Sequence, residues 1–323
     1  MTRVLDVEDL SVRFETDDGT VQAVDALSFT LDEHEVLAVV GESGCGKSVS
    51  LMSLLRLLPP SAHVSGRAQF DGHDLLTAPA SRVRRVRGRE IAFVFQEPMT
   101  SLNPSFRVGR QIAEVLRRHL GLTRRAAERR AVELLELVRI PAPDRRVNEY
   151  PHQLSGGMRQ RVMIAMALAC DPKVLVADEP TTALDVTIQA GILDLMRDIR
   201  ERLGTSIVLI THNLGVVADI ADRVLVMYAG RKVEEAPVKD LFRGPQHPYT
   251  VGLMGAIPRP GGADHQGRLR EIPGRVPSLV GPWEACAFAE RCPRADEKTR
   301  SEVPPLREVE RGHTVACFHP GPE

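Results

Sequence analysis

A glycine-rich loop near the start of the chain constrains the fold most. It follows the continuous apolar run 35–40, precedes a helical segment at 47–58, and reads Gly41-Glu42-Ser43-Gly44-Cys45-Gly46-Lys47-Ser48. Between a buried strand and a helix, such a loop lets successive backbone N–H groups converge on phosphate oxygens. The pattern predicts a nucleotide site, with Lys47 between the β- and γ-phosphates and Ser48 on Mg²⁺. The alternative is a glycine-rich turn that binds nothing.

Strand and helix patterns alternate along most of the chain. Residues 3–40 alternate apolar and polar side chains around a turn at 17–19, which is typical of an antiparallel sheet. The later alternation predicts an α/β protein whose parallel sheet is covered on both faces. We expect helices at 106–139 (with Thr123 as an N-cap), 155–170, 186–203 and from Asn213, strands at 173–178 and 206–211, and a hairpin at 223–236.

Two acidic residues, Asp178 and Glu179, stand at the end of the apolar strand 173–178. Burial of two adjacent carboxylates is costly unless partners compensate for it. We expect Asp178 to steady Mg²⁺ through water and Glu179 to polarise the water that attacks the γ-phosphate. A solvated strand end is the alternative interpretation.

Two further polar residues follow apolar strands. Gln96 comes after the run 91–95, and His212 comes directly after the strand 206–211. A glutamine there is able to contact both Mg²⁺ and the attacking water, and a histidine beside the strand of Asp178 is able to reach the γ-phosphate. Taken alone, each residue is also compatible with an ordinary surface or structural role.

A second glycine-rich turn opens the helix at 155–170, and it reads Leu154-Ser155-Gly156-Gly157-Met158-Arg159-Gln160. Serine is a preferred N-cap, so the turn is explained at minimum as a helix start. The same helix start is able to receive an anionic phosphate from another molecule. Its closeness in sequence to Asp178 and Glu179 favours the functional interpretation.

Together these motifs resemble the ATP-binding subunits of ABC transporters over about residues 3–240. The resemblance implies a RecA-like mixed sheet with an antiparallel β subdomain and a helical subdomain at about 100–170, within a cassette at 1–240. It implies that Ala183-Leu184-Asp185 contacts a second cassette and that Phe14 stacks on adenine, although Phe14 also suits a core position. Two cassettes would close head to tail, each ATP lying between one phosphate loop and the partner's Ser155, Gly156, Gly157 and Gln160.

The chain changes character after residue 244, where prolines become frequent and little regular structure is expected. The segments 95–104, 246–253 and 273–279 resemble those of peptide and nickel importer ATPases. The resemblance implies an oligopeptide-transporter-type C-terminal region at 241–323 and import of dipeptides or oligopeptides, with nickel as the alternative cargo. The implied partners are two transmembrane permease subunits, an identical or different second ATPase subunit, and an extracytoplasmic substrate-binding protein.

Five cysteines in a chain without an apparent export signal suggest thiols or metal ligands. Cys45 and Cys170 suit small buried positions. In the resembled importers a C-terminal cysteine group is able to hold a [4Fe–4S] cluster, and Cys286, Cys292 and Cys317 match three of its positions. Thr299 occupies the fourth, so a cluster would need another ligand, such as His313 or His319. The alternative is three reduced thiols that pack a small tail.

Composition and charge argue against a nucleic-acid-binding or membrane-spanning protein. The formal net charge is −1, which gives no indication of nucleic-acid binding, and the arginines at 82–89 and 124–130 suit solvated helix faces. The most apolar stretch, 162–170, is shorter than the ~18 residues that span a bilayer. We therefore expect a cytosolic chain attached peripherally to the cytoplasmic face of the cell membrane. Three other classes of ATPase fit the sequence less well. A chromosome-maintenance ATPase needs long coiled coils between the two glycine-rich motifs, and a translation factor normally carries two cassettes, whereas this sequence shows no sustained heptads and one cassette. An exporter ATPase would account for the cassette but not for the C-terminal region.

Overall fold

A computed structural model of the protein describes residues 2–17, 19–96, 101–182, 185–256, 272–277, 280 and 284–321. The chain forms two compact units, each assembled from separated segments. The first unit comprises Met1–Val4, Asp32–Glu35 and Ala78–Leu209. The second comprises Leu5–Leu31, Val36–Thr77 and Ile210–Glu323. The phosphate loop and the C-terminal region therefore share a unit, although they lie at opposite ends of the sequence.

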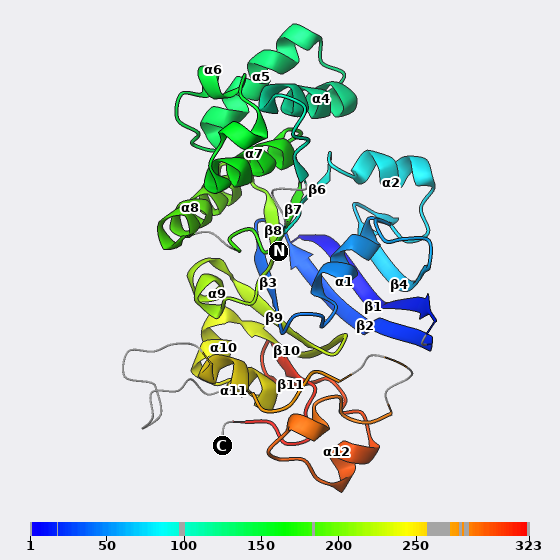
Figure 1. The fold of residues 1–323 in the computed structure, drawn as a ribbon. Helices are drawn as coiled ribbons and strands as arrows, with labels where there is room; N and C mark the ends of the chain where they lie inside the picture. Colours follow the sequence, from blue (N-terminus) through cyan, green and yellow to red (C-terminus); the bar gives the residue numbers. More distant parts are fainter. Residues whose placement is uncertain are drawn as a thin grey trace. The chain divides into compact units, whose positions relative to one another are not determined.

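The second unit contains most of the strands (Figure 1). They are β1 (Arg3–Thr16), β2 (Gly19–Asp32), β3 (Val36–Val40), β4 (Ala62–Phe70), β5 (His73–Asp74), β9 (Arg223–Tyr228), β10 (Arg231–Pro237), β11 (Arg307–Glu310) and β12 (His313–Val315). One set follows the order β2–β1–β4–β5, and β4 runs antiparallel to both β1 and β5. The other follows β11–β12–β10–β9–β3, in which β3 and β9 are parallel and the other neighbours are antiparallel.

Local sequence accounts for these strands. All five residues of β3 are apolar and buried, as expected for a parallel strand with no solvent-facing side. The hairpin β9–β10 turns through Ala229 and Gly230, which both have positive φ angles, as a tight two-residue hairpin requires. The predicted hairpin at 223–236 is thus confirmed.

The helices of the second unit are α1 (Lys47–Leu54), α9 (Leu214–Ile220), α10 (Val238–Arg243), α11 (Pro248–Gly255), α12 (Glu297–Ser301) and the 3₁₀ turn η2 (Ala289–Arg291). The expectation of little regular structure after residue 244 was wrong for α11, α12, β11 and β12. Proline is tolerated in the first turn of a helix, where its missing N–H has no intrahelical partner. Pro248 takes that position in α11, and the His247 ring accepts a hydrogen bond from the Tyr249 N–H at 3.0 Å.

The first unit carries the helical region and three strands in the order β8–β7–β6, with β6 and β7 parallel (Figure 1). Its elements are α2 (Ala80–Val86), β6 (Ile91–Val94), α4 (Val108–Leu120), α5 (Arg124–Leu137), α6 (Pro143–Arg146), the 3₁₀ turn η1 (Pro151–Gln153), α7 (Gly156–Leu168), β7 (Val174–Asp178), α8 (Val186–Leu203) and β8 (Ser206–Ile210). Thr123 caps α5, as predicted, and accepts a hydrogen bond from the Ala126 N–H. The helices pack through buried apolar side chains such as Ile112, Leu134 and Ile164.

No helix within the described part of the chain has both the length and the apolar character that crossing a bilayer requires.

Candidate functional site

The phosphate loop, residues 41–48, connects β3 to α1 and depends on two glycines. Gly41 and Gly46 have φ angles of 153° and 96°, which side-chain-bearing residues rarely adopt. A Cβ atom on Gly41 would lie 2.3 Å from the Met227 carbonyl oxygen, and one on Gly46 would lie 2.3 Å from that of Ala23. The loop is therefore packed against neighbouring backbone in a conformation that only glycine allows.

Lys47 begins α1 and is largely buried, at 6% exposure. Its Nζ donates to the carbonyl oxygens of Gly41 and Glu42, both at 2.8 Å. The ammonium group thus lies against the loop that precedes it. Among the described residues no side chain caps the start of α1, where Gly46 is the N-cap, so the first N–H groups of the helix point toward the loop as donors for an anion. Ser48 follows in the first turn, half-buried.

The four remaining loop residues differ in exposure, and Glu42 among them is half-buried. Ser43 and Gly44 are exposed at its tip. Cys45 is fully buried, as its expected packing role requires, and burial raises the pKa of its thiol. The Cys45 carbonyl oxygen accepts a hydrogen bond from the Gly230 N–H, which joins the loop to the β9–β10 turn. These backbone and side-chain features fit a triphosphate-binding loop.

The two acidic residues lie in the first unit at the end of β7. Asp178 is its last residue and is 5% exposed. Glu179 follows with a φ of 45°, a conformation that costs about 1–3 kcal/mol for a residue with a side chain. Such strain persists only where the surroundings hold it, and it often marks functional sites.

Gln96 and Glu179 are brought together although they are 83 residues apart in the sequence. Gln96 Nε2 donates to Glu179 Oε2 at 2.9 Å, and the Thr182 hydroxyl donates to the same oxygen at 2.8 Å. Two donors therefore orient the Glu179 carboxylate. Thr182 was not among the predicted residues of this group; in the sequence it stands out only as a hydroxyl three residues after Glu179.

The second glycine-rich turn begins α7. Ser155 is its N-cap, is exposed, and accepts a hydrogen bond from the Met158 N–H at 3.3 Å, so the predicted helix start is confirmed. Gly156 is exposed and Gly157 is buried against Ile188. Gln160 is buried, and within the described residues its amide nitrogen has no hydrogen-bond partner. Ser155 and Gly156 are thus the accessible members of this group.

The remaining predicted residues occupy strand and helix ends. Phe14 lies near the end of β1, half-buried and opposite Ala62 of β4. His212 is exposed between β8 and α9, next to Asn213, which is the N-cap of α9 at the predicted helix start. Asp185 caps α8. The predicted dimer-contact residues Ala183 and Leu184 lie outside the described residues, as do 97–100 and 278–279 of the importer-like segments.

The three tail cysteines do not fit a four-thiolate cluster. Thr299, at the fourth position, is 4% exposed and forms a capping box with Asp296. Its hydroxyl accepts from the Asp296 N–H and donates to the Asp296 carbonyl, both at 2.8 Å. The two alternative ligands are also engaged, since His319 contacts the Asp296 carboxylate at 2.8 Å and His313 contacts Glu234 at 2.7 Å.

Burial raises the thiol pKa of each tail cysteine, Cys286, Cys292 and Cys317, which favours the protonated form over the thiolate that binds iron. The described residues contain no group of three or more His, Cys, Asp or Glu side chains placed to hold a metal ion. The prediction of a [4Fe–4S] cluster on these cysteines is therefore not supported, and the donor set matches reduced, packed thiols.

Replacement of Thr299 by alanine tests this conclusion. Because the hydroxyl completes the capping box of α12 by bonding to the Asp296 backbone, we expect Thr299→Ala to lower the free energy of unfolding by about 0.5–1.5 kcal/mol, measured by urea denaturation. Ser301→Ala is the matched control, since that exposed hydroxyl bonds to the carbonyls of Glu297 and Lys298 in its own helix. A loss of bound iron or of visible absorbance in Thr299→Ala, purified anaerobically beside the parent, would contradict the capping role.

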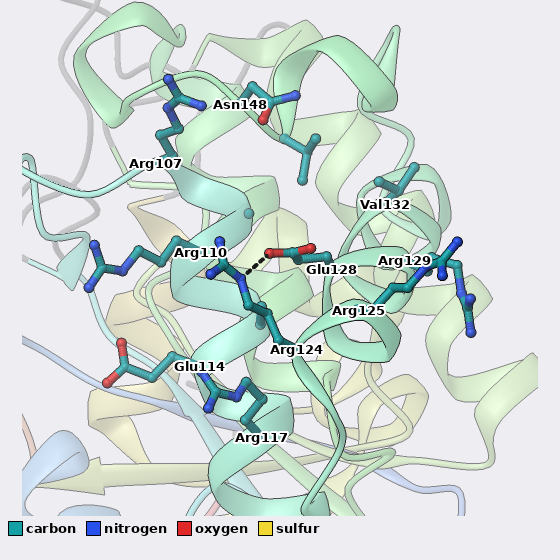
Figure 2. A pocket seen from close by; sticks show the side chains of 13 residues that line it. Arg107, Arg110, Glu114, Arg117, Arg124, Arg125, Glu128, Arg129, Val132 and Asn148 are labelled. Carbon is teal, nitrogen blue, oxygen red and sulfur yellow. Dashed lines mark hydrogen bonds and ion pairs between the residues drawn. The ribbon is translucent and has the colours of Figure 1, made fainter.

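Arginines surround a groove of about 950 Å³ between α4 and α5 (Figure 2). Arg124 pairs with Glu128 at 2.9 Å, whereas Arg125 and Arg129 are exposed on α5, as predicted. The groove has a positive balance of charge although the whole chain is close to neutral. Its charged lining comprises Arg107, Arg110, Arg117, Arg124, Arg125, Arg129, Glu114 and Glu128.

These features define a class of protein. A glycine loop between a buried strand and a helix, a buried strand that ends in Asp-Glu and a capped Ser-Gly-Gly helix are the parts of an ABC-type ATP-binding cassette. Residues 24–182 match the family described as ABC transporter, and residues 233–298 match the oligopeptide/dipeptide transporter C-terminal region. The chain belongs to the family of peptide ABC transporter ATP-binding proteins.

Curated relatives match the chain over nearly its whole length. A probable peptide ABC transporter ATP-binding protein of Sinorhizobium fredii is 53% identical, covering 98% of this chain and 94% of the relative. The oligopeptide and dipeptide transport ATP-binding proteins of Bacillus subtilis are each 50% identical, covering 99% and 98% of this chain and 90% and 95% of the relatives. The predicted resemblance to peptide importer ATPases is confirmed.

Solved structures agree with the fold. A dimeric ATP-binding cassette in a post-hydrolysis state with ADP and phosphate is 26% identical, with a TM-score of 0.65, and covers 72% of this chain and 98% of that one. A bacterial ABC transporter cassette, also dimeric, has a TM-score of 0.65 at 27% identity, covering 72% of this chain and 98% of its own. The predicted mixed α/β cassette fold and the ABC ATPase class are thus confirmed.

Proposed function

We propose that this chain is the ATP-hydrolysing subunit that energises import of dipeptides or oligopeptides through an ABC permease in the cytoplasmic membrane. The observation that carries the proposal is one continuous chain with a nucleotide cassette followed by the C-terminal region of oligopeptide and dipeptide transporters. Its likeness to peptide transport ATP-binding proteins extends over at least 97% of its length. In this role the protein would be attached peripherally to the cytoplasmic face of the membrane.

ATP is the substrate of the proposed reaction, and the loop at 41–48 would hold its phosphates. On binding, Lys47 would exchange its hydrogen bonds to the carbonyls of Gly41 and Glu42 for bonds to the β- and γ-phosphate oxygens. This exchange would need only a small movement, because the ammonium group already lies at the loop. Ser48 and Gln96 would contact Mg²⁺, with Asp178 acting through water, and Phe14 would stack on adenine. When bound, Mg²⁺ would neutralise the negative charge that develops on the phosphates.

Glu179 is the group we assign to polarise the attacking water. Hydrogen bonds from Gln96 and Thr182 to one carboxylate oxygen orient the side chain. His212 would hold the geometry of the water and the γ-phosphate. Orientation of a general base in this way reduces the entropy cost of the reaction.

The closed state would be a pair of cassettes, formed with an identical or a related ATPase subunit. In that state the exposed Ser155 and Gly156, with Gly157 and Gln160 behind them, would cover the triphosphate bound to the partner. Closure driven by ATP and opening after hydrolysis would shift a two-state equilibrium in the two permease subunits. An extracytoplasmic binding protein would deliver the peptide to them.

The basic groove between α4 and α5 supports attachment of the helical region to a permease. Guanidinium groups pair with carboxylates in a fork geometry, so the groove suits an acidic cytoplasmic segment of that partner.

An uptake measurement tests the proposed function. In cells that lack the gene we expect uptake of labelled di- and tripeptides to fall to background, while nickel uptake is unchanged, because the cassette supplies the energy for one cargo class. Return of peptide uptake with the parent gene, but not with a Lys47→Ala copy, is the control. Loss of nickel uptake with normal peptide uptake would assign the transporter to nickel instead.

A further inference from the structure

An arginine of the C-terminal region reaches into the phosphate loop. Arg291 ends η2, and its side chain is only 4% exposed. Its Nη1 and Nη2 donate to the two carboxylate oxygens of Glu42 at 2.7 and 3.0 Å. Glu42 is the second residue of the loop at 41–48. A bidentate pair between a guanidinium group and a carboxylate restrains both position and orientation.

The other donors of Arg291 are also used. Its Nε donates to the Pro273 carbonyl at 2.8 Å, Nη2 donates to the Ile272 carbonyl at 3.2 Å, and Nη1 donates to the Tyr228 hydroxyl at 3.4 Å. With the two bonds to Glu42, these contacts account for the five N–H groups of a guanidinium. The arginine is therefore held from several sides, and it is unable to swing away without leaving buried donors unpaired.

The backbone of Glu42 is held by the same region. Its N–H donates to the hydroxyl of Tyr249, on α11, at 2.8 Å. The Tyr249 ring lies against Tyr228 and Phe288, with centroid separations of 4.6 and 5.6 Å. One residue of the phosphate loop is thus fixed at both its side chain and its backbone by residues of the second unit that follow the cassette motifs in sequence.

The pair lies next to the lysine of the loop. The Glu42 carbonyl accepts a hydrogen bond from Lys47 Nζ, so a shift of Glu42 also shifts a contact of Lys47. The carboxylate of Glu42 adds negative charge to a loop whose proposed ligand is itself strongly negative, and Arg291 cancels it. Docking of the tail has a separate basis, because β12 pairs with β10 at the sheet edge.

We propose that Arg291 is a positioning residue of the nucleotide site, through which the C-terminal region increases affinity for the triphosphate by fixing Glu42 and neutralising its charge. The proposal rests on the assignment of residues 41–48 as the nucleotide loop in the proposed function.

The test measures nucleotide affinity of the full chain by titration, with ATP and ADP. We expect Arg291→Gln to weaken ATP binding about tenfold, and ADP binding less, because ADP carries less negative charge. In a Glu42→Gln background the same Arg291→Gln change should cost little, since there is no carboxylate left to neutralise. Arg294→Gln is the matched control; its guanidinium bonds to the carbonyls of His319 and Gly321, at the end of the tail.

Stability is measured in parallel by urea unfolding, because loss of a buried arginine is expected to destabilise the tail. A merely structural role predicts equal losses for ATP and ADP that persist in the Glu42→Gln background, and that result would overturn the proposal. Unchanged ATP affinity in folded Arg291→Gln would overturn it too. Lys47→Ala distinguishes failure of the Arg291 proposal from failure of the proposed function. If that variant binds ATP like the parent, the assignment of residues 41–48 as the nucleotide loop fails.

Discussion

Glu179→Gln is expected to lower steady-state ATP hydrolysis by about two to four orders of magnitude, the contribution of a well-placed general base, while ATP affinity is retained. The amide has the shape of the carboxylate, and its oxygen is able to accept the hydrogen bonds from Gln96 and Thr182. It lacks the negative charge and the basicity needed to polarise water. Binding without hydrolysis should also trap the closed pair of cassettes.

The measurement is phosphate release in the assembled transporter, together with the size of the isolated protein in ATP and Mg²⁺. Glu201→Gln makes the same chemical change at an exposed position on α8 and serves as the control. Retention of more than a small fraction of the parent's turnover by Glu179→Gln would show that another group polarises the water.

Lys47→Ala is expected to act on binding. Its ammonium group is the buried cation of the phosphate loop, and charge-assisted hydrogen bonds of this kind contribute about 1.5–3 kcal/mol. We therefore expect ATP affinity to fall by about one to two orders of magnitude, as measured by titration of the isolated chain. Hydrolysis should fall with it because the site is seldom filled.

Lys239→Ala removes the same charge from an exposed position on α10 of the same unit, and its ATP affinity should equal that of the parent. Equal weakening in both variants would show that only the overall charge matters. Parent-like affinity in Lys47→Ala would exclude its assigned contact with the phosphates.

Much of the fold followed from residues close to one another in sequence. Helix starts at Thr123, Ser155 and Asn213 were predicted correctly, because an N-cap bonds to N–H groups two or three residues later. The hairpin at 223–236 was also predicted correctly, because its turn is formed by the adjacent residues Ala229 and Gly230. The tail was predicted less well: its prolines suggested irregular structure, but Pro248 occupies a helix start, where proline is compatible with the backbone.

The candidate site was predictable in its parts but not in its connections. The motifs placed Gln96 and Glu179 in one group through a shared water, whereas the structure joins them by a direct hydrogen bond and adds Thr182. The roles assigned to the site residues stay predictions, including those of His212, Phe14 and Gln160. The iron–sulfur assignment is not supported, because Thr299, at the fourth position of the cysteine pattern, completes the capping box of α12 with Asp296. The spacing of the cysteines does not reveal that helix start.

By itself, the sequence determined the nucleotide loop, the order of strands and helices between residues 155 and 236, and the membership in a transporter family, because these depend on local spacing and on patterns shared with relatives. Only the tertiary structure decided which distant side chains meet. Arg291 and Glu42 lie 249 positions apart, and no local period or spacing links them. Their pairing arises because folding buries a guanidinium group, and a buried charge requires an opposite charge and hydrogen-bond acceptors around it.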